Sequence, residues 1–261
     1  MIKRSKFCSG LLFLATGFLW PCSPAFSADI ELKVSLVGNQ DMGNFRQPGG
    51  LFFDENKKRV YIADTGNNRL VSFDMEYNPI AEFDANGKLK LPSDVVRDKN
   101  GVFYLLAGRK KEFTKIDLAR KKYETVVIRN APSKANPIFP GRLAIDASGK
   151  LYVTDKGNGR ILVLDKDGGF LREISFPGRR TSFSDIRVDP EGILYALSTI
   201  DRKVYIFGRN GKLMKEFGEM GEGSGQFLFP VSLAVDKLKR VYVLDQHKGK
   251  VLVFEKGGMF L

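Results

Sequence analysis

A seven-residue segment recurs five times in this chain, and this internal repetition constrains the fold more than any other feature. Four of the copies begin with Pro and one with Phe, and every copy runs through an apolar stretch to an Asp. The first residues of successive copies lie 44, 48, 43 and 47 residues apart, which indicates one structural unit repeated along the chain. The copies are Pro48–Asp54, Pro92–Asp98, Pro140–Asp146, Phe183–Asp189 and Pro230–Asp236.

Each repeat continues with up to three further short apolar runs. In the third repeat these are Leu151–Asp155, Arg160–Asp165 and Phe170–Ile174, separated by turns rich in Gly, Asn and Asp. Short runs rich in β-branched and aromatic residues between such turns indicate β-strands, and no stretch has helical periodicity. The inner runs are apolar on both faces, so each sheet needs a covering layer on both sides. The sequence therefore predicts an all-β chain, a β-propeller of four-stranded antiparallel blades.

The repeat resembles the NHL repeat family. A segment ending in Asp, a second run of the type Tyr-Val-x-Asp and a third run introduced by Thr-Gly-Asn-Asn-Arg carry the resemblance. The linker Phe217–Phe227 also resembles the linker between NHL repeats. Two copies depart from the pattern, because Gly108 and Ser198 stand where the others have Asp. The resemblance implies a propeller and says little about function. The best copies are Pro48–Asp74, Pro140–Asp165 and Pro230–Glu255.

The repeat spacing predicts five blades, although NHL propellers usually have six, so a six-bladed propeller is the alternative. The last repeat stops where its fourth strand should begin. The segment 31–38 resembles the fourth strand of the preceding repeat, and it leads into Asp41–Phe45 and Pro48 as that strand leads into its linker. We therefore expect the N-terminal strand to close the last blade and so to remove the exposed edges of an open ring.

This closure predicts that deletion of residues 29–37 unfolds or aggregates the protein, because the last blade loses its outer strand. Thermal unfolding of the shortened chain tests this, and an unchanged melting curve would contradict the closure.

Residues 1–27 have the features of a bacterial secretory signal. Three basic residues precede the apolar run Gly10–Trp20, and Ala25–Ser27 places small residues where a signal peptidase cleaves. The apolar run is short for a membrane span, but an uncleaved anchor is one alternative. A lipoprotein is a second alternative, since Leu19 and Cys22 match two positions of a lipobox.

Cleavage would leave residues 28–261 as a single propeller domain in the periplasm or outside the cell. The formal net charge would fall from +12 to +9, because three basic residues leave with the signal. Both cysteines, Cys8 and Cys22, would leave as well. The mature chain would then contain no thiol, so its stability would come from packing without disulfides.

Three Asp residues at the end of second runs each precede a basic residue by five positions. The pairs are Asp64 with Arg69, Asp155 with Arg160, and Asp245 with Lys250. We interpret them as turns with ion pairs that recur because the loop recurs, which is a structural role. The alternative is a ring of charge pairs that binds a ligand.

Residues that do not repeat are better candidates for binding, because maintenance of the fold does not require them. By the resemblance, the loops after the second strand and before the first share the face that usually binds ligands. The second position of each first strand would line a central channel, where Arg142 is either neutralised by an acid or contacts a ligand. The loop candidates are Asn67, Asn68, Arg109, Lys110, Lys111, Lys156, Asn158, Asp201, Arg202, His247 and Lys248, and the channel positions are Gly50, Asp94, Arg142, Asp185 and Ser232.

Catalytic chemistry has little support in the sequence. His247 is the sole histidine, which excludes a zinc site built from several histidines. Asp94 and Asp185 could contribute to a calcium site, but Arg142 in the same ring would repel a cation. No spacing supports a Ser-His-Asp triad, and no motif for a bound cofactor is present. We predict no metal and no cofactor, and we keep a calcium-dependent enzyme similar to propeller lactonases or lyases as the alternative.

The positive charge favours anionic partners. Some NHL domains bind RNA, but an exported protein rarely meets RNA, so nucleic acid ranks low. Anionic envelope polymers and acidic protein surfaces are better suited partners. We therefore expect an exported, non-catalytic binding or scaffolding module for a protein or an anionic envelope ligand, with no oligomeric state indicated.

Overall fold

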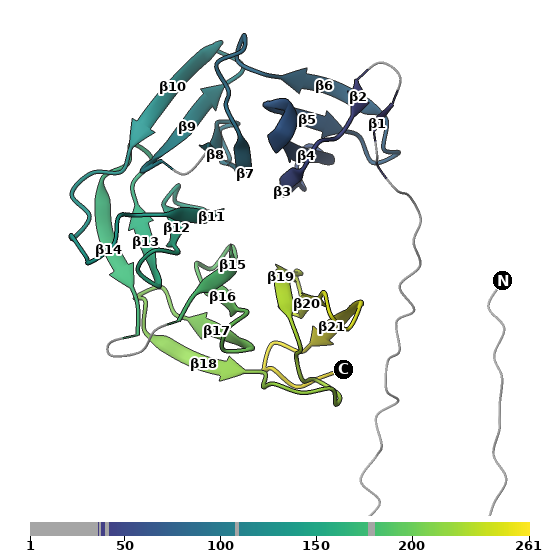
Figure 1. Ribbon diagram of the computed structural model, residues 1–261, viewed down its shortest axis with the longest axis vertical. Helices are drawn as coiled ribbons and strands as arrows, with labels where there is room; N and C mark the ends of the chain where they lie inside the picture. Colours follow the sequence, from purple (N-terminus) through teal and green to yellow (C-terminus); the bar gives the residue numbers. More distant parts are fainter. Residues whose placement is uncertain (1–35, 37, 40–41, 108–109, 177–180) are drawn as a thin grey trace, which may run out of the picture. The chain divides into compact units, whose positions relative to one another are not determined.

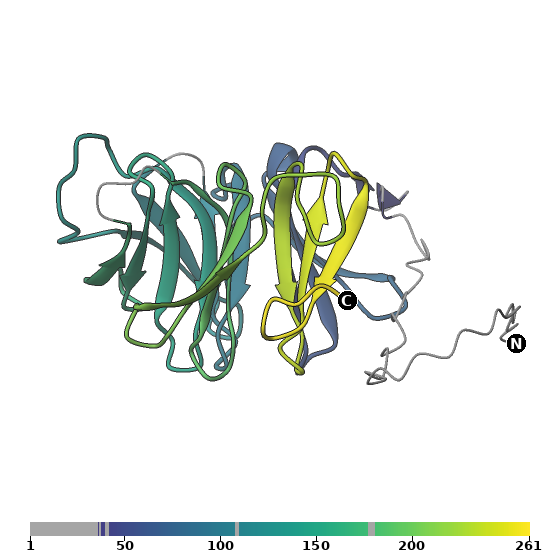
Figure 2. The same ribbon diagram turned by 90° about the horizontal axis from the view of Figure 1, so that it is seen from below.

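The computed structural model describes residues 36, 38–39, 42–107, 110–176 and 181–261. They all belong to the second of two units into which the chain divides, Glu31–Leu261. Within this unit, five antiparallel sheets follow one another around a central axis (Figure 1). The turns between strands gather on two opposite faces (Figure 2). The predicted all-β propeller with five blades is confirmed.

Each blade consists of consecutive strands, with the first strand innermost. Two short strands, β1 (Gly38–Asn39) and β2 (Gly43–Asn44), pair with each other ahead of blade 1. Blade 1 has β3 (Pro48–Asp54), β4 (Arg59–Asp64), β5 (Arg69–Phe73) and β6 (Pro79–Phe83), with a 3-10 turn at Thr65–Asn67, and blade 2 has β7 (Pro92–Arg97), β8 (Phe103–Ala107), β9 (Glu112–Asp117) and β10 (Lys122–Val127). Blade 3 has β11 (Pro140–Ile145), β12 (Leu151–Asp155), β13 (Arg160–Leu164) and β14 (Phe170–Ile174), and blade 4 has β15 (Phe183–Val188), β16 (Leu194–Ser198), β17 (Lys203–Phe207) and β18 (Leu213–Phe217). Blade 5 has β19 (Pro230–Val235), β20 (Val241–Asp245) and β21 (Lys250–Phe254).

The Asp that closes each repeat segment shapes the turn between the first and second strands. In blade 2, Asp98 Oδ1 accepts the backbone N–H groups of Asn100 and Val102, both at 2.9 Å. Gly101 completes this turn with a φ of +89°, a conformation that glycine adopts without steric cost. Asp146 makes the matching bonds in blade 3. The repeated Asp is thus explained by turn chemistry.

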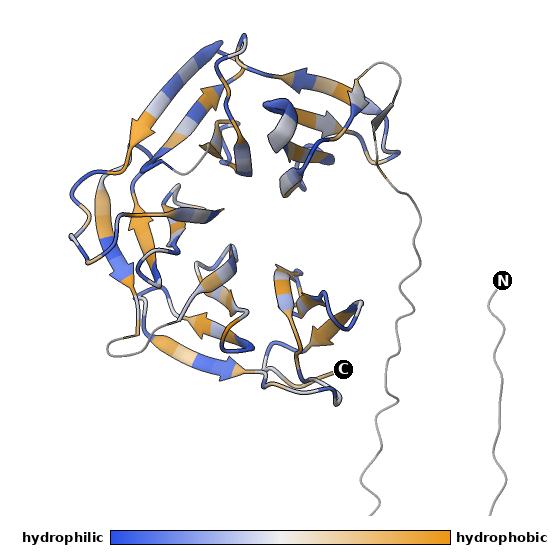
Figure 3. Ribbon diagram, in the orientation of Figure 1, coloured by the Kyte–Doolittle hydropathy of each residue, from blue (hydrophilic) through white to orange (hydrophobic). Residues whose placement is uncertain are grey.

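Neighbouring blades bury their apolar faces against each other. Four clusters of buried apolar side chains join blades 1 and 2, 2 and 3, 3 and 4, and 4 and 5. The middle strands of the blades are largely apolar and most turns are polar, whereas the outermost strands β6, β10, β14 and β18 also carry hydrophilic segments (Figure 3). Leu143, on the first strand of blade 3, faces blade 2 and is 1% exposed.

The junction between blades 5 and 1 is different. Leu51 occupies the register position of Leu143 but is 57% exposed, and Leu244 on β20 is 43% exposed. The blade-1 cluster around Ile62 packs instead against Leu36, Met42 and Phe45 from the N-terminal side. An ion pair of 2.7 Å between Lys237 Nζ and Glu55 Oε1 connects the two blades.

The expected closing strand lies mostly outside the described residues, which omit 31–35 and 37. Gly38 pairs with β2 and not with β21, so in the described residues the last sheet has three strands. Phe260 forms a single antiparallel bridge with Phe254, at the point where the fourth strand begins in other blades. The closure of the last blade by the N-terminal strand therefore stays a prediction.

Because Leu143 is buried and Leu51 is exposed at equivalent positions, replacement by alanine should affect stability differently at the two sites. Leu143→Ala should lower the free energy of unfolding by about 3 kcal/mol, because it leaves a cavity between two blades. Leu51→Ala should cost less than about 1 kcal/mol, because its side chain is largely in solvent. Urea unfolding of both variants measures this, and an equal loss would show that blades 5 and 1 are packed together in solution.

Candidate functional site

The loops between second and third strands share one face with the segments that enter the blades. Gly66 N–H donates to the Arg46 carbonyl, Lys156 N–H to the Phe139 carbonyl, and Gln246 N–H to the Phe229 carbonyl. We call this side, which carries the starts of all first strands, the entry face. The candidate site lies there, at the starts of the innermost strands.

The repeated Asp residues at the ends of second strands hold the entering chain. Asp64 Oδ1 accepts the N–H of Arg46 at 2.8 Å, and its other oxygen pairs with Arg69 Nε at 2.9 Å. Asp155 makes the same two kinds of contact, with Phe139 N–H at 3.0 Å and Arg160 Nε at 2.9 Å. These contacts are what the structural interpretation of the repeated pairs requires.

The third pair is not formed. Asp245 accepts the N–H groups of Leu228, Phe229 and Lys248. Lys250 is exposed and makes no ion pair with Asp245 among the described contacts. At Asp245 a backbone N–H bonds the carboxylate oxygen that an arginine Nε bonds in blades 1 and 3.

The inner ring consists of one residue from each first strand: Gly50, Asp94, Arg142, Asp185 and Ser232. Its two acids, Asp94 and Asp185, link one blade to the next. Asp94 Oδ2 accepts Leu143 N–H at 2.7 Å, and Asp185 Oδ2 accepts Leu233 N–H at 2.9 Å and the Ser232 hydroxyl at 2.7 Å. A register irregularity at the start of each receiving strand frees the N–H that donates. Asp94 is 5% and Asp185 1% exposed, so both carboxylates are buried.

Arginines accompany these acids. Arg142 Nη1 lies 3.8 Å from Asp94 Oδ1, and Arg142 Nε donates to the Ser184 carbonyl at 3.4 Å. Arg187 Nη1 pairs with Asp185 Oδ1 at 2.8 Å. The sequence analysis missed Arg187, although a signal existed, because the other copies have an apolar residue at its position in the first strand.

Lys156 completes the inner cluster. Its stem lies over Gly141, where a Cβ atom would come within 2.3 Å of Lys156 Cε. Its ammonium makes no hydrogen bond or ion pair with the described residues. Burial, and next the positive charge of Arg142, lower the pKa of Lys156, while Asp94 and Asp185 oppose this. We name Asp94, Arg142, Lys156, Asp185 and Arg187 the central cluster.

Burial raises the pKa of Asp94 to about 6, although Arg142 favours its ionised form. The Asp94 carboxyl group therefore changes its charge around pH 6. The net charge of the central cluster becomes more positive as the pH falls through this value.

Most of the predicted loop candidates have structural contacts on the entry face. The Asn67 side-chain N–H donates to the Asn44 carbonyl, and the Asn68 side-chain oxygen accepts Leu91 N–H. Lys248 Nζ donates to two linker carbonyls, those of Gly223 and Gln226. These side chains brace neighbouring segments and are not directed at one common point.

The remaining candidates are dispersed. The ring of His247 stacks on Phe229 with centroids 4.6 Å apart. Arg202 donates to the Ile200 carbonyl, and Lys110 lies 3.7 Å from Glu112. Lys111 is exposed. The structure therefore brings together the inner-ring residues and Lys156, and it leaves the other loop residues apart.

Two features are absent from the described residues. They contain no group of three or more His, Cys, Asp or Glu side chains arranged to hold a metal ion. No helix in the same part of the chain is long and apolar enough to cross a membrane.

Comparisons with known proteins agree with the fold. A model of the NHL repeat matches residues 138–164, and a family described as a 6-bladed β-propeller matches residues 181–261. The human NHL repeat-containing protein 3 is 28% identical over 124 residues, covering 41% of this chain and 35% of the relative. This chain thus matches about a third of that relative's length.

Solved structures show the same architecture at low sequence identity. A catalytically inactive histidine-to-alanine variant of virginiamycin B lyase from Staphylococcus aureus, solved with quinupristin, has a TM-score of 0.63 at 13% identity, covering 82% of this chain and 69% of its own. A gluconolactonase from Xanthomonas campestris has a TM-score of 0.63 at 18% identity, covering 82% and 74%. At such identities the likeness shows the fold alone, which is that of a β-propeller. The repeat matches and this fold agree, and both support an NHL-repeat β-propeller.

The raised pKa of Asp94 predicts a pH-dependent contribution to stability. Its folded pKa of about 6 lies above the value of roughly 3.9 expected in the unfolded chain, so the folded state binds the proton more tightly. The stability gained from Asp94 is present below about pH 4 and is lost as the pH rises through about 6. Relative to Asp94→Asn, the wild type should therefore gain up to about 3 kcal/mol between pH 7 and pH 4. Urea unfolding at both pH values measures the difference, and a difference that does not change with pH would contradict the assignment.

Proposed function

We propose that this NHL-repeat propeller is an exported, non-catalytic binding module that holds an anionic group of an envelope ligand at the central cluster. The observation that carries the proposal is the ammonium of Lys156, which has no counter-ion among the described residues and lies close enough to Arg142 for the arginine to lower its pKa. Two neighbouring cations with only one partner acid near Arg142 form a site that an anion would stabilise.

The inner acids do not supply the missing counter-ion. Asp185 is occupied by Arg187, Ser232 and the Leu233 N–H, and Asp94 by Leu143 N–H and Arg142. A carboxylate, phosphate or sulfate between Lys156 and Arg142 would raise the pKa of the lysine again and would be drawn in by both charges.

The same contacts argue against the calcium-dependent alternative. A divalent cation needs several free oxygen ligands, whereas the oxygens of Asp94 and Asp185 already accept backbone N–H groups and face arginines. A cation at this point would also meet Lys156. The donor set therefore fits an anion better than a calcium ion.

The similarity to the lyase does not point to a catalytic histidine in this chain either. The relative whose variant is inactive lost a histidine, whereas the sole histidine of this chain, His247, stacks against Phe229 in a loop of blade 5. No described acid or base of the central cluster contacts it.

The proposal that the protein is exported rests on the signal-like features of residues 1–27 in the sequence, which lie outside the described residues. The proposal predicts that protein recovered from the cell envelope begins at Ala28 and lacks Cys8 and Cys22. Mass spectrometry of the intact protein measures this, and a full-length chain in the cytoplasmic fraction would contradict export.

Lys156→Gln should weaken binding of a short polyanion, with heparin oligosaccharide as the probe, by roughly three- to tenfold, because one of two cations is removed. The matched control is Lys150→Gln, which removes the same charge from an exposed position in the same blade at the opposite face. Isothermal titration calorimetry at low ionic strength measures both affinities.

Equal weakening by both substitutions would show that heparin binding depends only on the net charge of the protein, and it would contradict a site at the central cluster. A calcium-induced rise in melting temperature that is abolished by Asp94→Asn would favour the enzyme alternative instead.

A further inference from the structure

The residue directly after the second strand braces the following blade in two places. The hydroxyl of Thr65 donates to the Pro92 carbonyl at 2.7 Å, and the hydroxyl of Thr199 donates to the Pro230 carbonyl. Pro92 and Pro230 begin the first strands of blades 2 and 5. Each of these two threonines therefore ties its own blade to the next one on the entry face.

Blade 3 has a lysine at this position, because Lys156 directly follows Asp155 at the end of β12. The described contacts give Lys156 no such bond to blade 4. Its stem lies instead over the first strand of its own blade, at Gly141. Its ammonium lies near the inner ring, since Arg142 and the two acids of that ring influence its pKa. At a position that braces neighbouring blades elsewhere, blade 3 thus directs a cation toward the central axis.

Gly141 leaves the room that this stem occupies. A Cβ atom on Gly141 would lie 2.3 Å from Lys156 Cε and 2.9 Å from Lys156 Cδ, which is closer than non-bonded carbon atoms can approach. It would also lie 2.8 Å from the hydroxyl oxygen of Thr154, which accepts the Arg142 N–H. An alanine at position 141 therefore has to displace the lysine stem, the threonine hydroxyl, or both.

The backbone does not explain this glycine. Gly141 is not one of the glycines with a positive φ, so any residue can adopt its conformation. Gly49 of blade 1 differs, because a Cβ atom there would lie 2.6 Å from the backbone oxygen of Ser93. The atoms nearest to a Cβ at Gly141 all belong to side chains, so the missing Cβ matters for side-chain packing. The equivalent residues of the other three blades carry a Cβ: Ser93, Ser184 and Val231.

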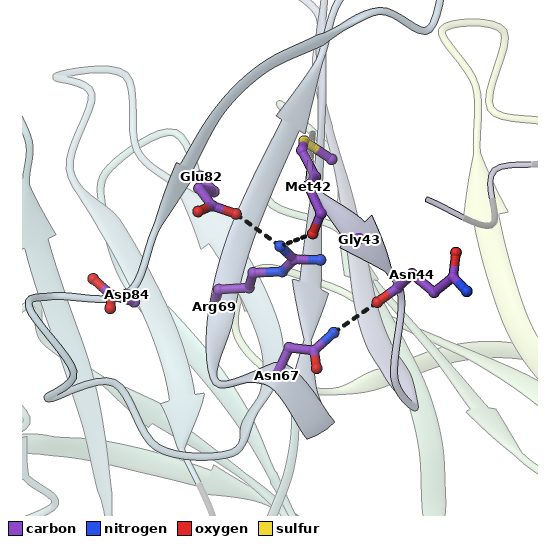
Figure 4. Close-up of a pocket in the computed structure, with 7 residues that line it drawn as sticks. All are labelled: Met42, Gly43, Asn44, Asn67, Arg69, Glu82 and Asp84. Carbon is purple, nitrogen blue, oxygen red and sulfur yellow. Dashed lines mark hydrogen bonds and ion pairs between the residues drawn. The ribbon is translucent and has the colours of Figure 1, made fainter. Parts of the chain in front are cut away.

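A pocket beside blade 1 contains a cation whose charge is already compensated. Figure 4 shows Arg69 in this pocket between Glu82 and the N-terminal segment. Arg69 Nη1 lies 2.7 Å from Glu82 Oε2 and also donates to the Met42 carbonyl. Lys156 has neither kind of partner among the described residues. An incoming anion therefore gains more from Lys156 than from Arg69.

We propose that Gly141 is a positioning residue of the anion site, because its missing side chain lets the Lys156 ammonium reach the central cluster beside Arg142. The inference rests on the proposed function of that cluster as an anion site. An alanine at position 141 turns the lysine outward, where water and salt screen its charge. The site then holds its ligand with one cation in place of two.

Acetylation of lysine side chains tests the position of Lys156 without any ligand. Only the neutral amine reacts, so a lysine with a lowered pKa reacts faster than an ordinary lysine at the same pH. At pH 8, Lys156 of the wild type should react at least roughly threefold faster than the exposed Lys150, and in Gly141→Ala the two rates should be equal. Peptide mass spectrometry measures both lysines in one sample. A rate ratio that is the same in the wild type and the variant would overturn the proposal.

Binding of heparin oligosaccharide tests the consequence for the site. Gly141→Ala should weaken binding roughly three- to tenfold, as Lys156→Gln does, and should cause no further loss in the Lys156→Gln background. An alanine that acted through Thr154 or through stability would weaken binding equally in both backgrounds, and that result would overturn the proposal. The control is Gly257→Ala in an exposed turn of blade 5, which should leave the affinity unchanged, because a Cβ atom there meets only Lys215 Nζ at 3.6 Å.

The two measurements separate this inference from the proposed function. A wild type that does not bind heparin would contradict the anion site, while the acetylation ratio would still decide whether Gly141 positions Lys156. A wild type that binds heparin through Lys156, with Gly141→Ala binding equally well, would keep the site and overturn the role of the glycine.

Discussion

The packing of one blade against the next is the constraint on which this structure depends. A sheet that is apolar on both faces is not stable when those faces are exposed to water, so each blade must pack between two neighbouring blades. Four buried clusters between successive blades meet this requirement. At the junction of blades 5 and 1 the requirement is met only in part, by Leu36, Met42 and Phe45. The N-terminal residues of the chain therefore act there as part of the core.

Carboxylates provide the second level of organisation, because they direct backbone groups that the sheets leave unpaired. Asp64, Asp155 and Asp245 hold the segments that enter the blades, and Asp94 and Asp185 tie a first strand to the one that follows. A carboxylate engaged in this way has little capacity for a ligand. The groups that remain available are those without such a task, and Lys156 is the clearest example among the described residues.

The sequence predicted the strands, the five blades and two of the three Asp–basic pairs, because these depend on period, turn residues and contacts only five positions apart. It placed Asp94 and Asp185 in an open channel, whereas the structure buries them. That difference arises from the irregular register at Leu143 and Leu233, which frees an N–H for each acid and cannot be read from spacing. The isolation of Lys156 also depends on distant residues, since it follows from the stem lying over Gly141 and from the arginines that occupy the acids.

Repetition within one chain allows an internal comparison that a single site would not. Arg69 with Glu82 and Arg160 with Glu173 have the same spacing and the same 2.7 Å contact. The entering segments differ: in blade 3 the Pro132 carbonyl accepts from Arg160 Nη2 and the Lys134 ammonium pairs with Glu173, whereas in blade 1 the Met42 carbonyl accepts from Arg69 Nη1. The buried, unpaired Nη2 of Arg69 is a cost that the fold bears without any compensation from the described residues. In blade 3 the equivalent nitrogen of Arg160 donates to the Pro132 carbonyl, so this cost is absent there.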